Sequence, residues 1–199
     1  MKIGRAANKR LQMEERIYNA SMTLFQEKGF TNTTLQEICE LAGVSKGTIF
    51  NYFSSKEDIL AKFGQNQIKI LGSFAEKLSS SMDVKSKIVA VLMEDIRGVK
   101  ESEVYARVTL KGISEGGELV YQLENKNRQA LSDIYKNILI QGLKPGFELN
   151  VSLVADLIVS IYFHVLDKHF NQNAELGLED FIIESVEILF NGIKDYLDE

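Results

Sequence analysis

The sequence contains a single proline, Pro145, and a single cysteine, Cys39, in 199 residues. Proline is the strongest interrupter of helices, so a chain that nearly lacks it and is rich in Leu, Ile, Glu and Lys is expected to form long helices. One cysteine cannot form an internal disulfide, and nothing in the sequence therefore indicates an oxidising compartment. We expect an all-α protein.

Long apolar segments are missing as well. No apolar run approaches the roughly 20 residues that a membrane-spanning helix requires. The first residues, MKIGRAANKRLQMEER, are charged and lack the apolar core of a signal peptide. These absences predict a cytoplasmic protein, and the length suits one domain or a small domain attached to a larger one.

The net charge of −5 argues at first against a nucleic-acid partner, but the charges are unevenly distributed. Residues 1–62 hold nine Lys and Arg against seven Asp and Glu, whereas residues 63–199 hold fourteen against twenty-one. The first ten residues contain no acid and four basic side chains, those of Lys2, Arg5, Lys9 and Arg10. This pattern predicts a basic N-terminal arm over residues 1–12, unless the run is a solvated tail without a function.

The next fifty residues predict three short helices with a tight turn. Apolar or small residues recur at the spacing of one buried helix face at Ile17, Ala20, Ser21, Leu24 and Phe25, and again at Leu35, Ile38, Cys39 and Ala42. Gly29 ends the first helix, and Thr34 with Glu37 has the spacing of a capping box. Gly43 suits a turn and Ser45 can cap a third helix, which together is the spacing of a helix-turn-helix.

The third helix, in GTIFNYF, combines an anchoring side and an outward side. Ile49 and Phe53 are four residues apart and can hold it to the other two helices. Phe50 and Tyr52 lie off that stripe, where they either meet a partner such as DNA or complete the small core. The polar set suited to a major groove is Lys46, Gly47, Thr48, Asn51 and Tyr52.

Residues 14–62 resemble the DNA-binding domain of the TetR family of bacterial transcriptional regulators. The resemblance rests on LFQEKGFTNTTLQEIC followed by AGVSKGTIFNYFSSKEDIL. Cys39 stands where alanine is usual in the family, and Phe50 stands where tyrosine is common, so any phosphate contact of that hydroxyl is absent here. The resemblance implies that a set of polar residues contacts DNA: Thr33, Thr34, Ser45, Lys46, Gly47, Thr48, Asn51, Tyr52 and Lys56.

The remainder of the chain predicts further amphipathic helices, over 55–80, 84–100, 103–114, 117–142, 151–171 and 178–197. The last two are apolar over more than one face, which requires burial on both sides, either in the chain's own core or against a second copy. The resemblance favours a homodimer with a four-helix interface that contains Val154, Ile158, Ile161, Tyr162, Val165, Ile182, Val186, Leu189, Phe190 and Ile193.

The resemblance also implies a small-molecule ligand, largely apolar, enclosed by the middle helices. Candidate lining residues, each of which is better explained as ordinary core when taken alone, are Phe74, Met93, Tyr105, Tyr121 and Phe163. The organisation expected from the sequence is a basic arm (1–12), a helix-turn-helix DNA-binding domain (13–58) and a larger helical ligand-binding and dimerisation domain (59–199). The function expected is that of a repressor that binds a palindromic double-stranded DNA operator and is released by its ligand.

The sequence offers less support for an enzyme or for a protein-binding adaptor. An enzyme is disfavoured because no phosphate-binding glycine loop, nucleophile elbow or partner for a catalytic cysteine is visible, and no cofactor is implied. His164 and His169 are five residues apart, which does not bring both to one metal as a spacing of four would. A helical protein-binding adaptor would explain the apolar last helices but not the basic start together with the tight turn.

Overall fold

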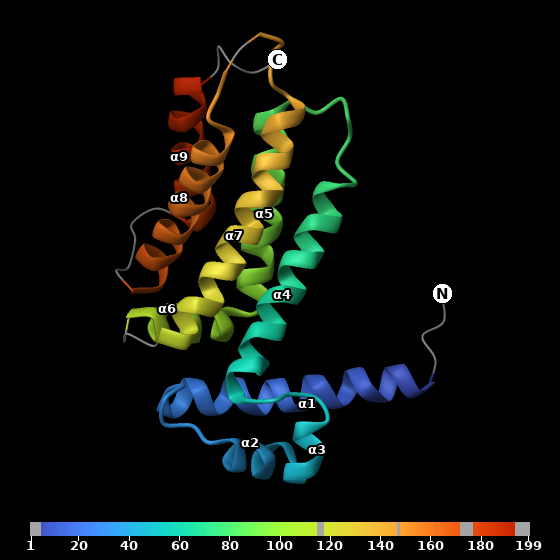
Figure 1. Ribbon diagram of the computed structural model, residues 1–199. Coiled ribbons are helices and arrows are strands. Elements are labelled where there is room, and N and C mark those ends of the chain that lie inside the picture. Colours follow the sequence, from blue (N-terminus) through green and yellow to red (C-terminus); the bar gives the residue numbers. More distant parts are fainter. Residues whose placement is uncertain (1–4, 115–117, 147, 172–176, 194–199) are drawn as a thin grey trace. The chain divides into compact units, whose positions relative to one another are not determined.

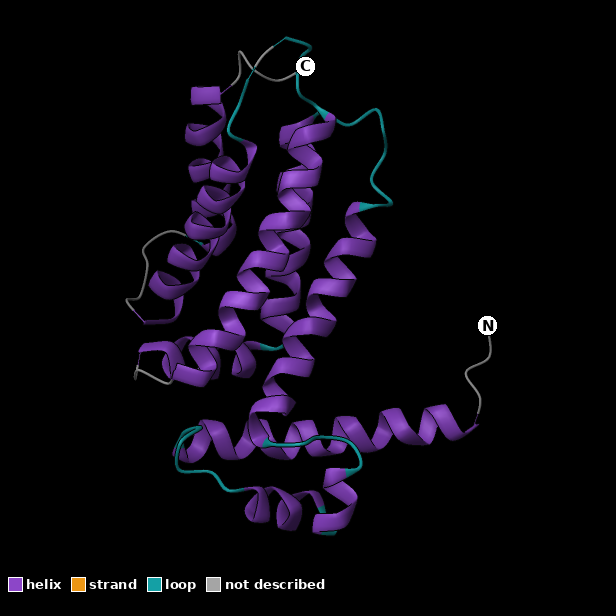
Figure 2. Ribbon diagram, viewed as in Figure 1, coloured by secondary structure: helices purple, strands orange, loops and turns teal. Residues whose placement is uncertain are grey.

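The computed structural model describes residues 5–114, 118–146, 148–171 and 177–193. This part of the chain is helical and contains no strand (Figure 2), which confirms the all-α prediction. The helices are α1 (Arg5–Lys28), α2 (Leu35–Ala42), α3 (Lys46–Phe50), α4 (Lys56–Ala75), α5 (Val84–Glu101), α6 (Glu103–Ser114), α7 (Glu118–Gln141), α8 (Val151–Asn171) and α9 (Leu178–Ile193).

Two boundaries differ from the sequence prediction in ways that matter for function. Residues 5–12, which were expected in a basic arm, form the first two turns of α1, while residues 1–4 lie outside the described part. The third helix ends at Phe50, so Asn51 is its C-cap and Tyr52 follows it. The predicted last helix reached residue 197, but residues 194–199 are outside the described part.

The chain divides into two compact units. The first contains Met1–Gly64 and Ser102–Leu123, and the second contains Gln65–Glu101 and Glu124–Glu199. Both α4 and α7 therefore begin in the first unit and continue into the second. The domain boundary expected after residue 58 remains a prediction.

The first unit is built on α1, which contacts both α2 and α6 (Figure 1). Its core contains the predicted stripe residues Ile17, Phe25, Ile38 and Ile49, all buried. Val108 of α6 joins the same cluster, so α6 belongs to this core. Gly29 has φ +83°, the left-handed conformation that ends α1 and that glycine adopts without a Cβ penalty.

The second unit buries α5 against α9, and α9 also contacts α8, beside which it lies in Figure 1. Its most deeply buried side chains come from α5, α7, α8 and α9, and Leu71 of α4 is buried as well. The largest of those that are fully buried are Tyr135, Ile88, Leu92, Ile96, Leu131, Leu139, Ile158 and Ile182.

The expected dimer residues are mostly part of this core. Seven of the ten are buried by their own chain, namely Val154, Ile158, Tyr162, Val165, Ile182, Val186 and Phe190, whereas Ile161, Leu189 and Ile193 are half-buried. A side chain that its own chain covers has no surface left for a second copy, so those seven assignments are corrected. The large apolar side chains that α8 and α9 do expose are Leu153, Leu157, Ile183 and Ile188.

Candidate nucleic-acid interface

The start of α2 is fixed by a capping box, as its sequence predicts. The Thr34 hydroxyl accepts a hydrogen bond from the Glu37 backbone N–H, and the Glu37 carboxylate accepts one from the Thr34 N–H at 2.8 Å. Lys28 of α1 pairs with the same carboxylate. The hydrogen bond from Lys28, followed by those from Thr34, lowers the pKa of Glu37 to about 2. The carboxylate thus ties the end of α1 to the start of α2.

The turn after α2 is held from two sides. Gly43 has φ +62°, and its N–H and that of Val44 donate to the last carbonyls of α2, which is the usual left-handed end of a helix. Arg16 of α1 donates from Nη2 to the Gly43 carbonyl at 3.0 Å. The turn is therefore held by its own backbone hydrogen bonds to α2 and by one hydrogen bond from α1.

The short helix α3 is capped by Ser45, whose hydroxyl accepts from the Thr48 N–H at 3.1 Å. Ile49 is fully buried and Phe53, beyond the helix, is nearly so, which confirms the expected anchoring side. On the opposite side Lys46, Gly47 and Asn51 are exposed. Phe50 is also half exposed, at 50%, so it does not complete the core.

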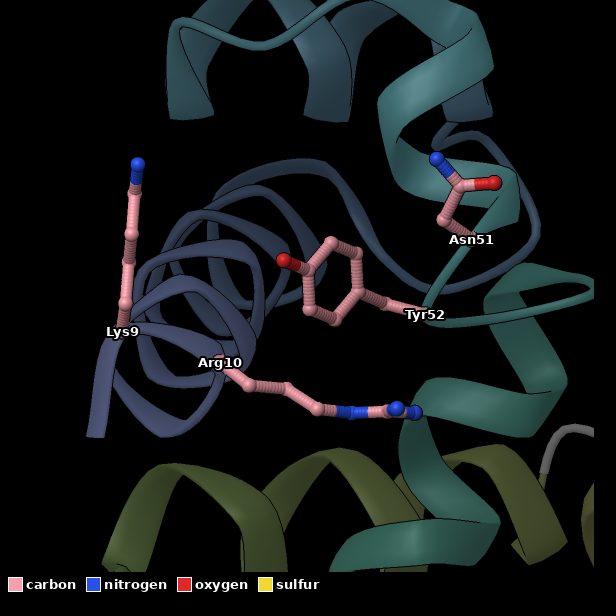
Figure 3. A pocket seen from close by; sticks show the side chains of 4 residues that line it. All are labelled: Lys9, Arg10, Asn51 and Tyr52. Atoms are coloured by element: carbon pink, nitrogen blue, oxygen red, sulfur yellow. The ribbon is translucent and has the colours of Figure 1, made fainter. Parts of the chain in front are cut away.

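A pocket of about 290 Å³ joins this outward side to α1. Its lining residues are Lys9, Arg10, Asn51 and Tyr52 (Figure 3). The Arg10 guanidinium lies 5.7 Å from the centre of the Tyr52 ring, and Figure 3 shows the Tyr52 hydroxyl directed toward α1. Arg10 is held in turn by Glu14 of α1, at 3.2 Å, and Glu14 also binds Lys62 of α4 at 2.8 Å.

The sequence predicted functional roles for the lining residues on both sides of this pocket, but it did not predict that they lie beside one another. Lys9 and Arg10 were expected in an arm, and Asn51 with Tyr52 on the third helix. The apolar spacing of α1 continues back from Ile17 to Met13, which places the helix start earlier than residue 17, but it stops short of Lys9 and Arg10 and gives no signal for them. Within one helix their side chains have defined positions beside Tyr52.

Two residues expected to contact DNA have their polar groups occupied within the protein. Thr33 is buried, and its hydroxyl donates to the Gly29 carbonyl at 2.9 Å. The Lys56 ammonium donates to the carbonyls of Phe30, Thr31 and Thr33 at 2.6, 3.2 and 2.9 Å. An ammonium has three N–H donors, so all of them are used, and burial lowers the pKa of Lys56. Lys56 therefore closes the 30–33 loop, which corrects its expected phosphate contact.

The expected ligand residues are not gathered in one unit. Phe74, Met93 and Phe163 are half-buried in the second unit. Tyr105 belongs to the first, where its ring centre lies 4.5 Å from that of Phe63, and Tyr121 is about half exposed, at 51%. Only the first three therefore remain as candidates for a site inside the second unit.

Neither a metal site nor a membrane span is found in the described ranges. Among these residues no group of three or more His, Cys, Asp or Glu side chains is placed to hold a metal ion. His164 and His169 are both exposed. None of the helices described is long and apolar enough to cross a membrane.

Comparison with known proteins adds to this geometry. Residues 17–63 match the sequence profile of the family described as bacterial regulatory proteins, tetR family. The chain is 29% identical over 195 residues to YerO, an uncharacterized HTH-type transcriptional regulator of Bacillus subtilis, in an alignment that covers 92% of this chain and 66% of YerO. The chain thus spans just under two thirds of the length of that relative.

Two solved structures share the fold. A TetR-family transcriptional regulator from Syntrophomonas wolfei has a TM-score of 0.80 at 24% identity, over 92% of this chain and 96% of that one. FadR from Bacillus subtilis, solved in complex with stearoyl-CoA, has a TM-score of 0.73 at 22% identity, over 89% and 98%. The capped turn and the outward polar side of α3 lie within residues 17–63, the segment that matches the profile of the bacterial tetR regulatory proteins, so this segment is similar to the DNA-binding domain of that family.

Proposed function

We propose that this protein is a cytoplasmic transcriptional repressor that binds an operator as a homodimer and releases it when a small molecule binds. The single observation that carries the DNA-binding half is the pocket in which Lys9 and Arg10 of α1 meet Asn51 and Tyr52. Lys9 and Arg10 can contact the phosphate backbone, while the exposed polar side of α3 beside them can reach base edges.

The roles divide by chemistry. Lys46, Thr48 and Asn51 would meet base edges or adjacent phosphates in the major groove, since amide and ammonium groups match the hydrogen-bond pattern displayed there. Arg10, Lys9 and the Tyr52 hydroxyl would hold one stretch of backbone, which fixes register without reading sequence.

Gly47 would allow the start of α3 to approach DNA closely. A Cβ added at this position would meet only the Ser45 hydroxyl oxygen, at 3.9 Å, which is ordinary van der Waals contact. The protein's own packing therefore does not require glycine here, so a close approach of α3 to DNA would be the reason for glycine at this position, unless it is simply tolerated near a helix start.

A second copy of the chain would cover the apolar side chains that α8 and α9 expose. Leu153 and Leu157 are one turn apart on α8, and Ile188 of α9 is 70% exposed. Covering such side chains is favourable, and a two-fold pair of DNA-binding units would read a roughly palindromic operator with half-sites at least one DNA turn, about 34 Å, apart.

The ligand would bind in the second unit. Support comes from the fold shared with FadR, which was solved with stearoyl-CoA bound. Coupling between a ligand and DNA usually amounts to about 1–3 kcal/mol, or roughly 5- to 150-fold in operator affinity. A ligand that binds the DNA-free conformation more tightly than the DNA-bound one by that amount would be enough to release the operator.

The test is a selection of DNA from a random pool by the purified full-length protein at two salt concentrations. We expect a palindrome whose affinity falls steeply with salt, because phosphate contacts release counterions. Lys46→Ala should reduce the slope of log affinity against log salt by about one. The matched control is Lys77→Ala, which removes an exposed lysine from the second unit and should leave the slope unchanged.

No enriched sequence at either salt concentration would contradict the proposal. Binding to a protein partner with little salt dependence would then favour the adaptor function instead.

A further inference from the structure

One carboxylate beside the proposed DNA-binding pocket binds two cations at once. The Oε1 atom of Glu14 accepts a hydrogen bond from the Arg10 Nε–H at 3.2 Å and another from the Lys62 ammonium at 2.8 Å. Arg10 and Glu14 lie one turn apart on α1, whereas Lys62 belongs to α4. All three residues are in the first unit. The Arg10 side chain, which lines the pocket, is therefore tied through Glu14 to a second helix.

The Glu14 carboxylate is itself held in place. Lys62 has a second contact, because its Nζ atom lies 5.0 Å from the centre of the ring of Phe53, which is nearly buried. The side chain of Glu14 is 19% exposed, against 63% for that of Arg10. Burial acts to raise the pKa of Glu14, but the hydrogen bonds from Lys62 and Arg10, together with their positive charges, outweigh it and lower the pKa. Glu14 is thus a half-buried anion that holds one end of an exposed arginine.

Helix stability does not account for this arrangement. On a helix, a cation four residues before an acid is the weaker of the two possible orders, and exposed pairs at this spacing contribute little to stability. What the pair does provide is a defined position for the Arg10 guanidinium, which lies 5.7 Å from the centre of the Tyr52 ring. Figure 3 shows the Arg10 side chain extending from α1 past Tyr52.

The guanidinium of Arg10 keeps an edge with which to bind phosphate. A guanidinium has five N–H donors in a planar fork, and its two Nη groups can bind a phosphate through two parallel hydrogen bonds. Arg10 uses only Nε for Glu14, and among the described residues its Nη groups have no hydrogen-bond partner. A phosphate can therefore bind Arg10 without displacing Glu14.

The charges around Glu14 also favour a phosphate. A carboxylate paired with Arg10 alone would cancel its charge, but Glu14 is shared with Lys62, so two cations and one anion leave a charge of +1. Lys9 lines the same pocket and adds a further cation. The attraction of Arg10 for an anion is therefore retained although it is paired.

We propose that Glu14 is the positioning residue for the phosphate contact of Arg10, with Lys62 as its anchor. This inference rests on the proposed function, because it explains how one of the proposed backbone contacts is held ready before DNA binds. A side chain that already has its bound position loses less conformational entropy on binding, so its contact contributes more affinity. Glu14 would act only through Arg10, without touching DNA.

The experiment compares Glu14→Met with a matched control, Glu15→Met, which removes the same charge from the next position of α1. Glu15 is exposed, and within the described ranges it has no ion pair. Binding of the full-length protein to a fluorescent DNA duplex of mixed sequence is measured by anisotropy at low salt, because a backbone contact does not depend on sequence. Loss of a negative charge should strengthen binding by Glu15→Met, by about twofold at most. Glu14→Met should instead weaken it by about threefold.

The same substitutions in an Arg10→Ala background test whether Glu14 acts through Arg10. There Glu14→Met should no longer weaken binding and should match Glu15→Met. A loss that persists without Arg10 would overturn the proposal, since it would come from a general change in α1. Equal affinities of the two variants in the presence of Arg10 would overturn it as well.

Urea unfolding of each variant ensures that folded proteins are compared. If Glu14→Met does not fold, Glu14→Gln takes its place, with Glu15→Gln as the control. Glutamine keeps the size of the side chain and a weaker, uncharged acceptor, so the expected loss is then about twofold. The same two outcomes would overturn the proposal.

The failure of this inference is distinguishable from failure of the proposed function. A protein that selects an operator although Glu14→Met and Glu15→Met bind DNA alike remains a regulator, whose Arg10 is not positioned by Glu14. A protein that shows the Arg10-dependent loss on mixed-sequence DNA but enriches no sequence retains this positioning and loses the proposed function. Absence of binding to any duplex at low salt would overturn both.

Discussion

The turn between α2 and α3 differs from the buried group of Asp95, Tyr135 and Tyr162 in the second unit in how far its polar groups have hydrogen-bond partners. At the turn each of the main polar groups has a partner: Glu37 binds Lys28 and Thr34, and Arg16 binds the Gly43 carbonyl. In the second unit the buried Tyr135 hydroxyl has no partner among the described residues, and burial and the charges of Glu124 and Glu94 raise the pKa of Asp95 against the hydrogen bond that Tyr162 donates to it.

The difference bears on rigidity. The proposed DNA-binding surface needs its backbone held in one geometry before binding, and satisfied hydrogen bonds provide that rigidity. In the second unit the buried Tyr135 hydroxyl without a partner costs free energy instead.

The contributions of Asp95 and Glu37 to folding stability should change with pH in opposite directions. The change from Asp95 should be the larger of the two. Its pKa rises from 3.8 to about 7 on folding, so its contribution to stability is fully present below pH 4 and is lost as pH rises through about 7. The loss amounts to at most about 4 kcal/mol. Glu37, whose pKa is lowered to about 2, contributes stability above its unfolded pKa of 4.5 that is lost as pH falls toward 2.

Urea unfolding at pH 4.5, 6 and 8 measures how the free energy of unfolding depends on pH. Asp95→Asn should be more stable than the wild-type protein at pH 8 and nearly equal to it at pH 4.5, whereas Glu37→Gln should be less stable at both. A constant difference between Asp95→Asn and the wild-type protein across this range would contradict the assignment.

Gly142→Ala should destabilise the second unit by about 1–3 kcal/mol through overpacking. A Cβ at this position would lie 1.9 Å from the Cγ2 atom of Val84, which is a stiff, buried side chain. Thermal or urea unfolding of the variant gives the loss. The double variant with Val84→Ala should recover part of it, and a simple sum of the two single losses would show that the clash is not the cause.

Lys56→Met should lower the unfolding free energy by about 1–2 kcal/mol, because three carbonyls of the 30–33 loop lose their donor. The salt dependence of operator binding should stay unchanged, since the ammonium has no donor left for a phosphate. A reduced salt slope with unchanged stability would return Lys56 to the set of phosphate contacts.

Gly47→Ala should have the smallest effect on folding and a selective effect on DNA. Alanine fits the space at this position and favours a helix, so the unfolding free energy should rise by less than about 1 kcal/mol. Affinity for the operator should fall by about fivefold, or about 1 kcal/mol, because the added methyl group holds α3 away from DNA. Unchanged affinity would show that the glycine is simply tolerated near a helix start.

Local signals made most of the first unit predictable. The Thr34 capping box, the left-handed Gly43 and the Ser45 cap each depend on residues no more than four apart in sequence, and all three were found as expected. Lys56 and Thr33 were misassigned because their partners lie across the fold, where spacing gives no information.

The second unit shows the same limit more strongly. The apolar stripes of α8 and α9 predicted helices but not which stripe faces inward, since both sides of each helix carry large apolar residues. Asp95 was overlooked although a charged residue within the stripe of Leu92 and Ile96 is a visible anomaly. Its neighbours Tyr135 and Tyr162 are brought to it from other helices, and only the fold shows that they meet.

The most direct test of the account is the binding of the selected operator, and of operators with single base changes, by the wild-type protein, Tyr52→Phe and Asn51→Ala. Tyr52→Phe should weaken binding to all of these sequences alike, because it removes a backbone contact. Asn51→Ala should remove discrimination, worth about 1–3 kcal/mol, at particular base pairs. Equal effects of both variants at every position would contradict the division between backbone and base contacts on which the proposed interface depends.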